Sequence, residues 1–166
     1  FSVLYEIQNG EIECLGMTQL INDSKGQFRG IRLAPRFSKM LSPEVSEFLF
    51  KEADFISWYN ERIPLAILKL LPGYSGPVGV DALVRRDDQG RLMLRHVVEL
   101  NVRMTMGRVA LELQKKLNPN GWAYFSIQRK EKYKEGGVTL NDPDQAKEFL
   151  AIWESHQGDS IALIRK

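Results

Sequence analysis

Apolar and polar residues alternate along the first part of the chain, a pattern that predicts β-strands. Residues 1–8 (FSVLYEIQ) alternate and end at Asn9-Gly10, a dipeptide typical of tight hairpin turns. Residues 11–20 would form the return strand, and residues 27–33 a third strand after a polar turn. Consecutive strands joined by short turns predict an antiparallel sheet.

The spacing of apolar residues then changes to that of a helix. Ser42-Pro43-Glu44 combines an N-cap serine, a proline in the first turn and an acid near the positive helix end, so a helix should begin there. Pro64 should kink or restart this helix, and Pro72-Gly73 should end it. The apolar residues that predict its buried face are Val45, Phe48, Leu49, Ile56, Tyr59 and Ile63.

A second hairpin and further elements follow. Residues 78–84 and 92–103 predict two strands around a turn at residues 87–90, and residues 106–117 predict an amphipathic helix. The expected C-terminal elements are a strand at 122–128, a short helix at 145–153 and a strand at 161–165.

Together these elements predict an α+β fold, with a mainly antiparallel sheet and packed helices. We expect residues 1–117 to form one domain, with residues 118–166 as a strand–helix–strand extension packed on it. Because the chain begins at Phe1 directly in a strand-like run, we expect it to be a piece of a longer protein.

Composition narrows the classes of partner. The 166 residues include 23 basic and 21 acidic side chains, and a net charge of +2 is too small to indicate a nucleic-acid or membrane surface. The basic run at residues 128–134 has aromatic neighbours, which can favour single-stranded nucleic acid, but Glu131 and Glu135 dilute its charge. We therefore expect neither nucleic acid nor membrane as a partner.

The single cysteine, Cys14, cannot form an internal disulfide, which indicates a reducing compartment. No apolar stretch is long enough for a membrane span, and no signal peptide is visible. These observations predict a cytoplasmic protein.

The most informative segment is the second hairpin, because one face of its second strand is polar. Glu99, Asn101 and Arg103 share a face by alternation, whereas their neighbours along the strand are apolar. A turn centred on Gln89 would place Asp81 diagonal to Glu99 on that face, opposite Val97. A register two residues different would place Asp81 directly opposite Glu99, and a shift of one residue would separate the two acids.

Two carboxylates and an amide oxygen form an all-oxygen ligand set, which suits Mg²⁺ or Mn²⁺ rather than zinc. The arginine two residues further on suits a phosphate or carboxylate, because its planar fork binds such groups through two hydrogen bonds. This face therefore predicts a magnesium and phosphate site. The alternative is an ordinary ion pair between Glu99 and Arg103 on a solvated sheet face.

The same residues resemble a known family. Residues 98–103 (VELNVR), followed by MTMG at 104–107, resemble the closing motif of the ATP-grasp superfamily. Residues 79–81 (GVD) look like the preceding strand with its metal-binding acid, and the close match extends from residue 76 to about residue 113. The resemblance implies the C-terminal part of an ATP-grasp fold.

The resemblance also implies roles for individual residues. Asp81, Glu99 and Asn101 would hold magnesium on the phosphates of ATP, and Arg103 would face the transferred phosphoryl group. Leu83 would lie under the adenine, although a plain core leucine is an equally good interpretation. The implied reaction activates a small carboxylate as an acyl phosphate, which an amine or thiol then attacks.

Other features of such enzymes are missing from the sequence. It has no glycine-rich phosphate lid, so we expect the remainder of its own parent chain to complete the site, and the isolated fragment to be inactive. Arg29 could help to bind phosphate, or it could be a solvated strand residue. His96 falls on the face opposite Glu99, which favours a structural or surface histidine over a catalytic one. The alternative function is a non-catalytic module for nucleotide sensing or protein interaction on the same fold.

Overall fold

The computed structural model describes residues 1–117, 122–129, 149–154 and 160–165. They fall into two compact units, each built from segments that are separate in the sequence. The first unit comprises Phe1–Gln19 and Arg36–Val109, and the second comprises Leu20–Pro35 and Ala110–Lys166. The division of the chain at residue 117 stays a prediction.

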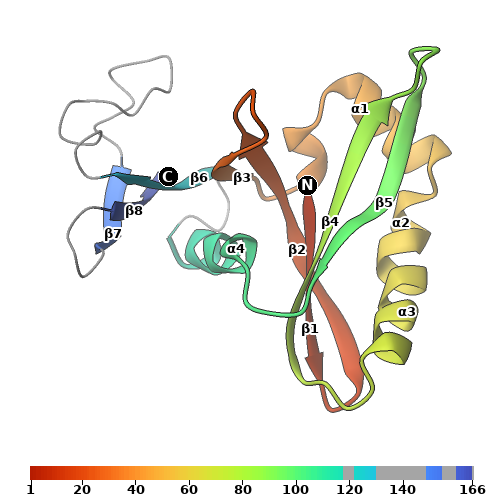
Figure 1. The fold of residues 1–166 in the computed structure, drawn as a ribbon, viewed down its shortest axis with the longest axis horizontal. Helices are drawn as coiled ribbons and strands as arrows, with labels where there is room; N and C mark the ends of the chain where they lie inside the picture. The colour runs from red at the N-terminus through yellow and green to blue at the C-terminus, as the bar shows by residue number, and fades with distance from the viewer. Residues whose placement is uncertain (118–121, 130–148, 155–159, 166) are drawn as a thin grey trace. The chain divides into compact units, whose positions relative to one another are not determined.

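The first unit is built on an antiparallel arrangement of strands in the order β5-β4-β1-β2 (Figure 1). β1 spans Ser2–Gln8, β2 Glu11–Asn22, β4 Gly76–Arg86 and β5 Leu92–Asn101. β2 continues beyond Gln19 into the second unit. The predicted strands of both hairpins are confirmed, with ends that differ by a few residues.

The turn between β1 and β2 has the geometry that its sequence predicts. Asn9 and Gly10 both have positive φ, at 54° and 80°. This left-handed pair matches the right-handed twist of the strands, and asparagine and glycine adopt it at the lowest steric cost.

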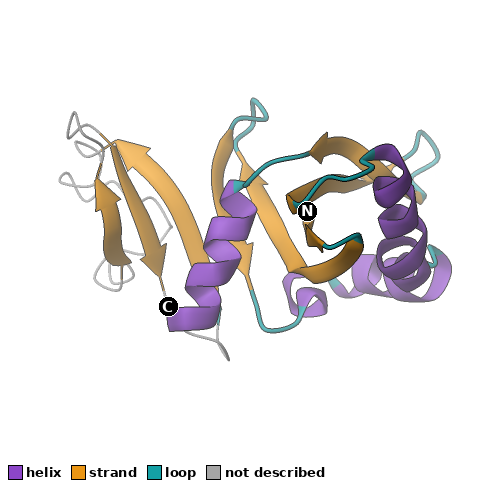
Figure 2. Cartoon of the chain, turned by 90° about the horizontal axis from the view of Figure 1, so that it is seen from below, coloured by secondary structure: helices purple, strands orange, loops and turns teal. Residues whose placement is uncertain are grey.

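A series of short helices lies along one face of this sheet (Figures 1 and 2). The predicted start is confirmed, since the Ser42 hydroxyl accepts a hydrogen bond from the Val45 amide at 3.3 Å, ahead of Pro43. The segments are a 3₁₀-helix at Phe37–Met40, α1 at Pro43–Glu47, a π-helical turn at Phe48–Glu52, α2 at Phe55–Ser57, a second π-helical turn at Trp58–Arg62, and α3 at Ile63–Leu70.

Pro64 restarts the helix, as its sequence position predicts. Proline has no amide hydrogen to donate to the preceding turn, so an uninterrupted α-helical bond pattern cannot run through it. The chain instead makes the π-helical turn Trp58–Arg62 and begins α3 at Ile63, with Pro64 in its first turn.

The core of the first unit lies between the sheet and these helices. Val3 and Tyr5 of β1 pair with Val80 and Val78 of β4, and all four are buried on the helix-facing side. The Tyr5 hydroxyl donates to the Tyr59 carbonyl at 2.7 Å, and burial raises the pKa of the Tyr5 phenol far above its ordinary value. The alternate residues of β1 and β4 point to the opposite face of the sheet, where the candidate site lies.

The second unit has its own strands and the larger part of a helix. β3 spans Phe28–Leu33, β6 Ala123–Arg129, β7 Phe149–Glu154 and β8 Ser160–Arg165, in the antiparallel order β3-β6-β8-β7. α4 spans Met106–Leu117, the residues that the sequence pattern predicts.

The expected helix at residues 145–153 is wrong where the structure describes it. Residues 149–153 belong to β7, and residues 145–148 lie outside the described residues. The apolar run FLAIW fits a strand as well as a short helix, and pairing with β8 decides in favour of the strand. The α+β class, with antiparallel strands and packed helices, is confirmed. Among the described residues, no helix is sufficiently long and apolar to span a membrane.

Candidate functional site

The register of the β4–β5 hairpin changes along its length. Near the turn, Leu83 pairs with Arg95, which is the register predicted for a turn centred on Gln89. Beyond that point Asp81 pairs with Glu99, because β5 contains two additional residues in a β-bulge. The prediction that Asp81 faces Val97 is therefore wrong by two residues. An even number of inserted residues preserves the alternation of faces, so Asp81 and Glu99 still share one face.

Polar residues form a row across four strands at this level of the sheet. Thr18 of β2 pairs with Ser2 of β1, Ser2 with Asp81 of β4, and Asp81 with Glu99 of β5. Ser2 is only 5% exposed, and its hydroxyl donates a hydrogen bond to Asp81 Oδ1. The row thus runs from a buried end at Thr18 to an exposed end at Glu99.

Asn101 connects Asp81 to Arg103. Its side chain is buried, at 7% exposure of the residue, and Nδ2 donates to Asp81 Oδ2 at 3.3 Å. Its Oδ1 accepts a hydrogen bond from Arg103 Nη2 at 3.0 Å, while Arg103 Nη1 donates to the Met104 carbonyl at 3.4 Å. Within the described residues Glu99 forms no ion pair, so the alternative of a Glu99–Arg103 pair is not what the structure contains.

The chemistry of this donor set fits Mg²⁺. Asp81 and Glu99 offer carboxylate oxygens on one face, and magnesium commonly uses one or two carboxylates while keeping waters and nucleotide phosphates in its shell. Asn101 presents its nitrogen to Asp81 and its oxygen to Arg103. To offer that oxygen to an ion beside Asp81, the amide would have to turn over and give up both of these hydrogen bonds.

The segment that carries Arg103 is held at its far end by the start of α4. The Thr105 hydroxyl accepts a hydrogen bond from the Arg108 amide at 3.2 Å, which caps the helix. Arg108 Nη1 binds Glu6 Oε2 of β1 at 2.6 Å in a partly buried ion pair. Gly79 of β4 lets the Thr105 side chain pack closely against the strand, since a Cβ at position 79 would lie 3.0 Å from Thr105 Cγ2.

The structure does not bring all predicted residues into one cluster. Leu83 lies on β4 two residues beyond Asp81 and is half-buried, opposite Arg95. Arg29 belongs to the second unit, where its guanidinium binds Asp23 Oδ2 at 2.6 Å. The Gln27 amide and then Arg29 lower the pKa of the Asp23 carboxyl below its ordinary value. The roles of Leu83 and Arg29 in cofactor binding remain predictions.

Ser2 is a site residue that the sequence analysis did not identify. Nothing in residues 1–8 marks it, because its contact with Asp81 depends on β1 pairing with a strand almost eighty residues later. The only feature of the sequence that could have indicated Ser2 is that it is a polar residue on the strand face opposite Val3 and Tyr5.

Replacing Ser2 by alanine should lower the free energy of unfolding by about 1–2 kcal/mol, since Asp81 loses a partly buried, charge-assisted hydrogen bond. Urea-induced unfolding would measure this change. Ser57→Ala is the matched control, because the Ser57 hydroxyl makes an exposed contact with Glu61 at 3.5 Å. Equal effects of the two substitutions would contradict the role given to Ser2.

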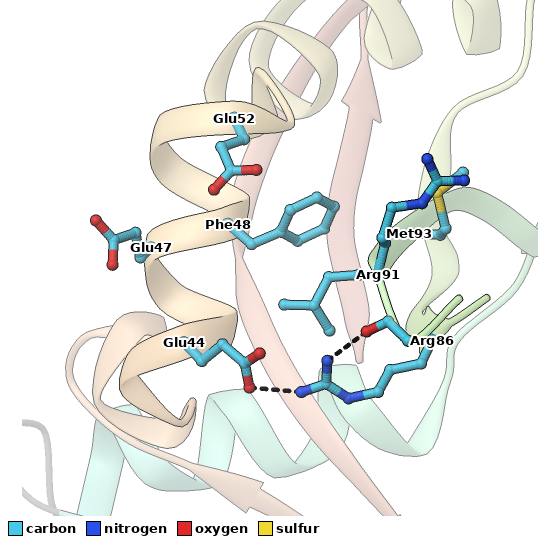
Figure 3. Close-up of a pocket in the computed structure, with 9 residues that line it drawn as sticks. Glu44, Glu47, Phe48, Glu52, Arg86, Arg91 and Met93 are labelled. Carbon is cyan, nitrogen blue, oxygen red and sulfur yellow. Dashed lines mark hydrogen bonds and ion pairs between the residues drawn. The ribbon is translucent and has the colours of Figure 1, made fainter. Parts of the chain in front are cut away.

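A separate cavity of about 640 Å³ lies between α1 with its following π-helical turn and the tip of the β4–β5 hairpin (Figure 3). Glu44 and Arg86 form an ion pair across it at 2.6 Å, and Arg86 Nη1 also donates to the Gly90 carbonyl at 2.7 Å. Their side chains are about half exposed, and none of the predicted site residues lines this cavity. The polar row is therefore the better candidate for phosphate chemistry.

Comparisons with known proteins agree with the fold. No protein-family model and no curated protein sequence matches the chain. Among solved structures, the chain is similar to the biotin carboxylase subunit of pyruvate carboxylase, with a TM-score of 0.53 and 16% identity over 99% of this chain. It is also similar to the biotin carboxylase domain of Hydrogenobacter thermophilus 2-oxoglutarate carboxylase, with a TM-score of 0.50 and 14% identity over 99% of the chain.

Biotin carboxylase domains are ATP-grasp enzymes, so the chain has the fold of part of an ATP-grasp domain. It spans 41% of the length of each of these two proteins.

Proposed function

We propose that the chain supplies the metal- and phosphate-binding strands of an ATP- and Mg²⁺-dependent ligase. The ligase would activate a small carboxylate as an acyl phosphate for attack by an amine or thiol. The observation that carries the proposal is the placement of Asp81 directly opposite Glu99, with Asn101 joining Asp81 to Arg103. That arrangement combines hard oxygen ligands with a fixed cation on one sheet face.

One of the two solved structures supports the nucleotide and the class of substrate. The Hydrogenobacter thermophilus domain was crystallised with MgADP, ADP and bicarbonate. A magnesium nucleotide and a small carboxylate-like anion are the ligands that the donor set of this chain suits. For the acid that this protein would activate, we propose only its chemical class, a small carboxylate.

The proposed reaction has two steps. A carboxylate oxygen of the substrate bonds to the γ-phosphorus of ATP, while the bond from that phosphorus to the bridging oxygen breaks and ADP leaves. The amine or thiol then bonds to the acyl carbon, inorganic phosphate leaves with the electrons of the broken C–O bond, and the proton of the nucleophile passes to solvent.

The residues of the chain would act mainly by position and charge. Asp81 and Glu99 would bind Mg²⁺, which neutralises charge on the phosphates. Ser2 and Asn101 would hold the Asp81 carboxylate through its two oxygens. Arg103 would bind the phosphoryl group as it is transferred, with its guanidinium oriented by Asn101.

Glu99→Gln in the full-length protein should weaken Mg²⁺-dependent binding of ADP at least about tenfold, which corresponds to 1.4 kcal/mol. The substitution keeps the size of the side chain and removes the negative charge that would bind the ion. Calorimetric titration with ADP, with and without Mg²⁺, measures the effect without knowledge of the acid substrate.

Glu11→Gln is the matched control, because Glu11 is an exposed strand glutamate of the same unit. It should leave the Mg²⁺-dependent affinity unchanged. If Glu99→Gln binds Mg·ADP as tightly as the unsubstituted protein, the metal site is not where we place it. Tight Mg·ADP binding with no phosphate release from ATP, for any small carboxylate including bicarbonate, would instead indicate a nucleotide-sensing module.

A further inference from the structure

The bulge in β5 determines whether the two acidic residues face each other. Between Leu83–Arg95 and Asp81–Glu99, one residue of β4, Ala82, lies opposite three residues of β5, 96–98. If the register at the turn continued without the bulge, Asp81 would face Val97 and Glu99 would lie two residues further along. The geometry of the candidate site therefore depends on what keeps the bulge in place.

A bulge leaves backbone groups without partners in the strand ladder, and these groups need other hydrogen bonds. Here the carbonyl of His96 accepts a hydrogen bond from the Tyr59 hydroxyl at 2.9 Å. Tyr59 is fully buried in the core and belongs to the π-helical turn Trp58–Arg62, on the face of the sheet opposite the polar row. The bulge is thus attached to the helix layer through its own backbone.

The His96 side chain makes a second attachment. Its ring packs on Trp58 with the ring centroids 4.0 Å apart, and the Arg62 guanidinium lies 4.9 Å from the centre of the same indole. His96 Nε2 is buried and has no hydrogen-bond partner among the described residues. Burial, followed by the charge of Arg62, lowers the pKa of His96 below its ordinary value, which favours the neutral ring that stacks there.

We propose that Trp58, Tyr59 and His96 form a bulge clamp, and that this clamp acts from the opposite face of the sheet to hold Glu99 in register with Asp81. The effect of the clamp on Mg²⁺ binding rests on the proposed function. Its effect on the pairing of Asp81 with Glu99 does not. His96 and Tyr59 are then positioning residues, since neither touches the polar row. By contrast, Val97 and Val98 are each 45% exposed, so burial of their side chains does little to hold the bulge.

The register can be tested without any ligand. In a Cys14→Ser background of the full-length protein, the pair Asp81→Cys and Glu99→Cys should form a disulfide under mild oxidation. The pair Asp81→Cys and Val97→Cys should not. Directly opposed residues have the Cα separation that a disulfide requires. Tyr59→Phe and His96→Ala should reduce the first cross-link and increase the second. Unchanged cross-linking in both variants would overturn the clamp.

The effect on the site is tested by Mg²⁺-dependent binding of ADP to the full-length protein. Tyr59→Phe and His96→Ala should each weaken it about tenfold, the lower end for residues that orient metal ligands. Tyr74→Phe is the matched control, because it removes another partly buried hydroxyl-to-carbonyl bond of the same unit, from Tyr74 to the Pro77 carbonyl at 3.0 Å, whose donor and acceptor lie outside the clamp. A loss in Tyr74→Phe equal to that in Tyr59→Phe would show general destabilisation and contradict the proposal.

A deletion provides the rescue. Removing Val97 and Val98 together takes out the two additional residues and lets a regular ladder place Glu99 opposite Asp81. In the His96→Ala background this deletion should restore Mg²⁺-dependent binding, and failure to restore it would count against the clamp. If Glu99→Gln itself has no effect on that binding while the cross-links behave as expected, the proposed function fails and the clamp stands.

Discussion

An Arg103→Met substitution in the full-length protein should lower ATP-dependent phosphate release about 100- to 1,000-fold. The guanidinium is permanently charged and oriented by Asn101 at 3.0 Å, on the sheet face that carries both acids. In the proposed reaction, its charge meets the phosphoryl group as that group moves between oxygens. Because the interaction strengthens during transfer, the loss should fall on kcat more than on Mg·ADP affinity.

Arg103→Lys separates charge from geometry. Lysine keeps the positive charge but lacks the planar fork, so it should recover only a small part of the lost rate. Arg85→Met is a suitable control, since Arg85 is an exposed arginine on the same hairpin and should leave turnover unchanged. A turnover in Arg103→Met within about twofold of the unsubstituted protein would remove Arg103 from the proposed mechanism.

Gly30→Ala should lower the free energy of unfolding of the second unit by at least about 3 kcal/mol. A Cβ at Gly30 would lie 2.5 Å from the Tyr124 hydroxyl oxygen and 2.8 Å from the Phe125 carbonyl oxygen. The carbonyl belongs to the backbone of β6, which pairs with β3 at the next residue, Ile31. Neither strand can move aside without disturbing that pairing.

Gly26→Ala separates this steric effect from backbone strain. Gly26 lies in the same unit with φ of 77°, and a Cβ there would meet no atom within 4 Å. Its substitution should cost only about 1–2 kcal/mol, the price of a left-handed residue with a side chain. Urea-induced unfolding followed by tryptophan fluorescence would compare the two variants. A smaller loss for Gly30→Ala than for Gly26→Ala would contradict the close approach of β3 and β6.

Local patterns in the sequence predicted the elements that depend on local forces. Asn9-Gly10 marks a turn by its left-handed backbone, and Ser42-Pro43 marks a helix start by its cap, so both were identifiable. The segment FLAIW at residues 149–153 has no polar residue that would reveal a period, so the sequence alone does not distinguish a strand from the expected helix at 145–153. Only the pairing of β7 with β8, which is a tertiary interaction, resolves that ambiguity.

The sequence was sufficient to predict which side chains of the candidate site share one face of the sheet. It was not sufficient to predict which residues of β4 and β5 pair with each other. Alternation along β5 places Glu99, Asn101 and Arg103 together, and an inserted pair of residues leaves that alternation unchanged. The bulge is therefore invisible in the apolar pattern. The Ser2 contact was also inaccessible, since it depends on the non-local pairing of β1 with β4.

Because the bulge adds an even number of residues to β5, it limits which changes of hairpin length related sequences can accumulate. Insertions or deletions of two residues between Asp81 and Glu99 keep both acids on the same side of the ribbon, whereas a change of one residue sends one of them to the core. Descendants of this sequence that retain both acids should therefore tolerate hairpin length changes in steps of two. Odd-length changes should survive only with a second, compensating insertion or deletion in the same hairpin.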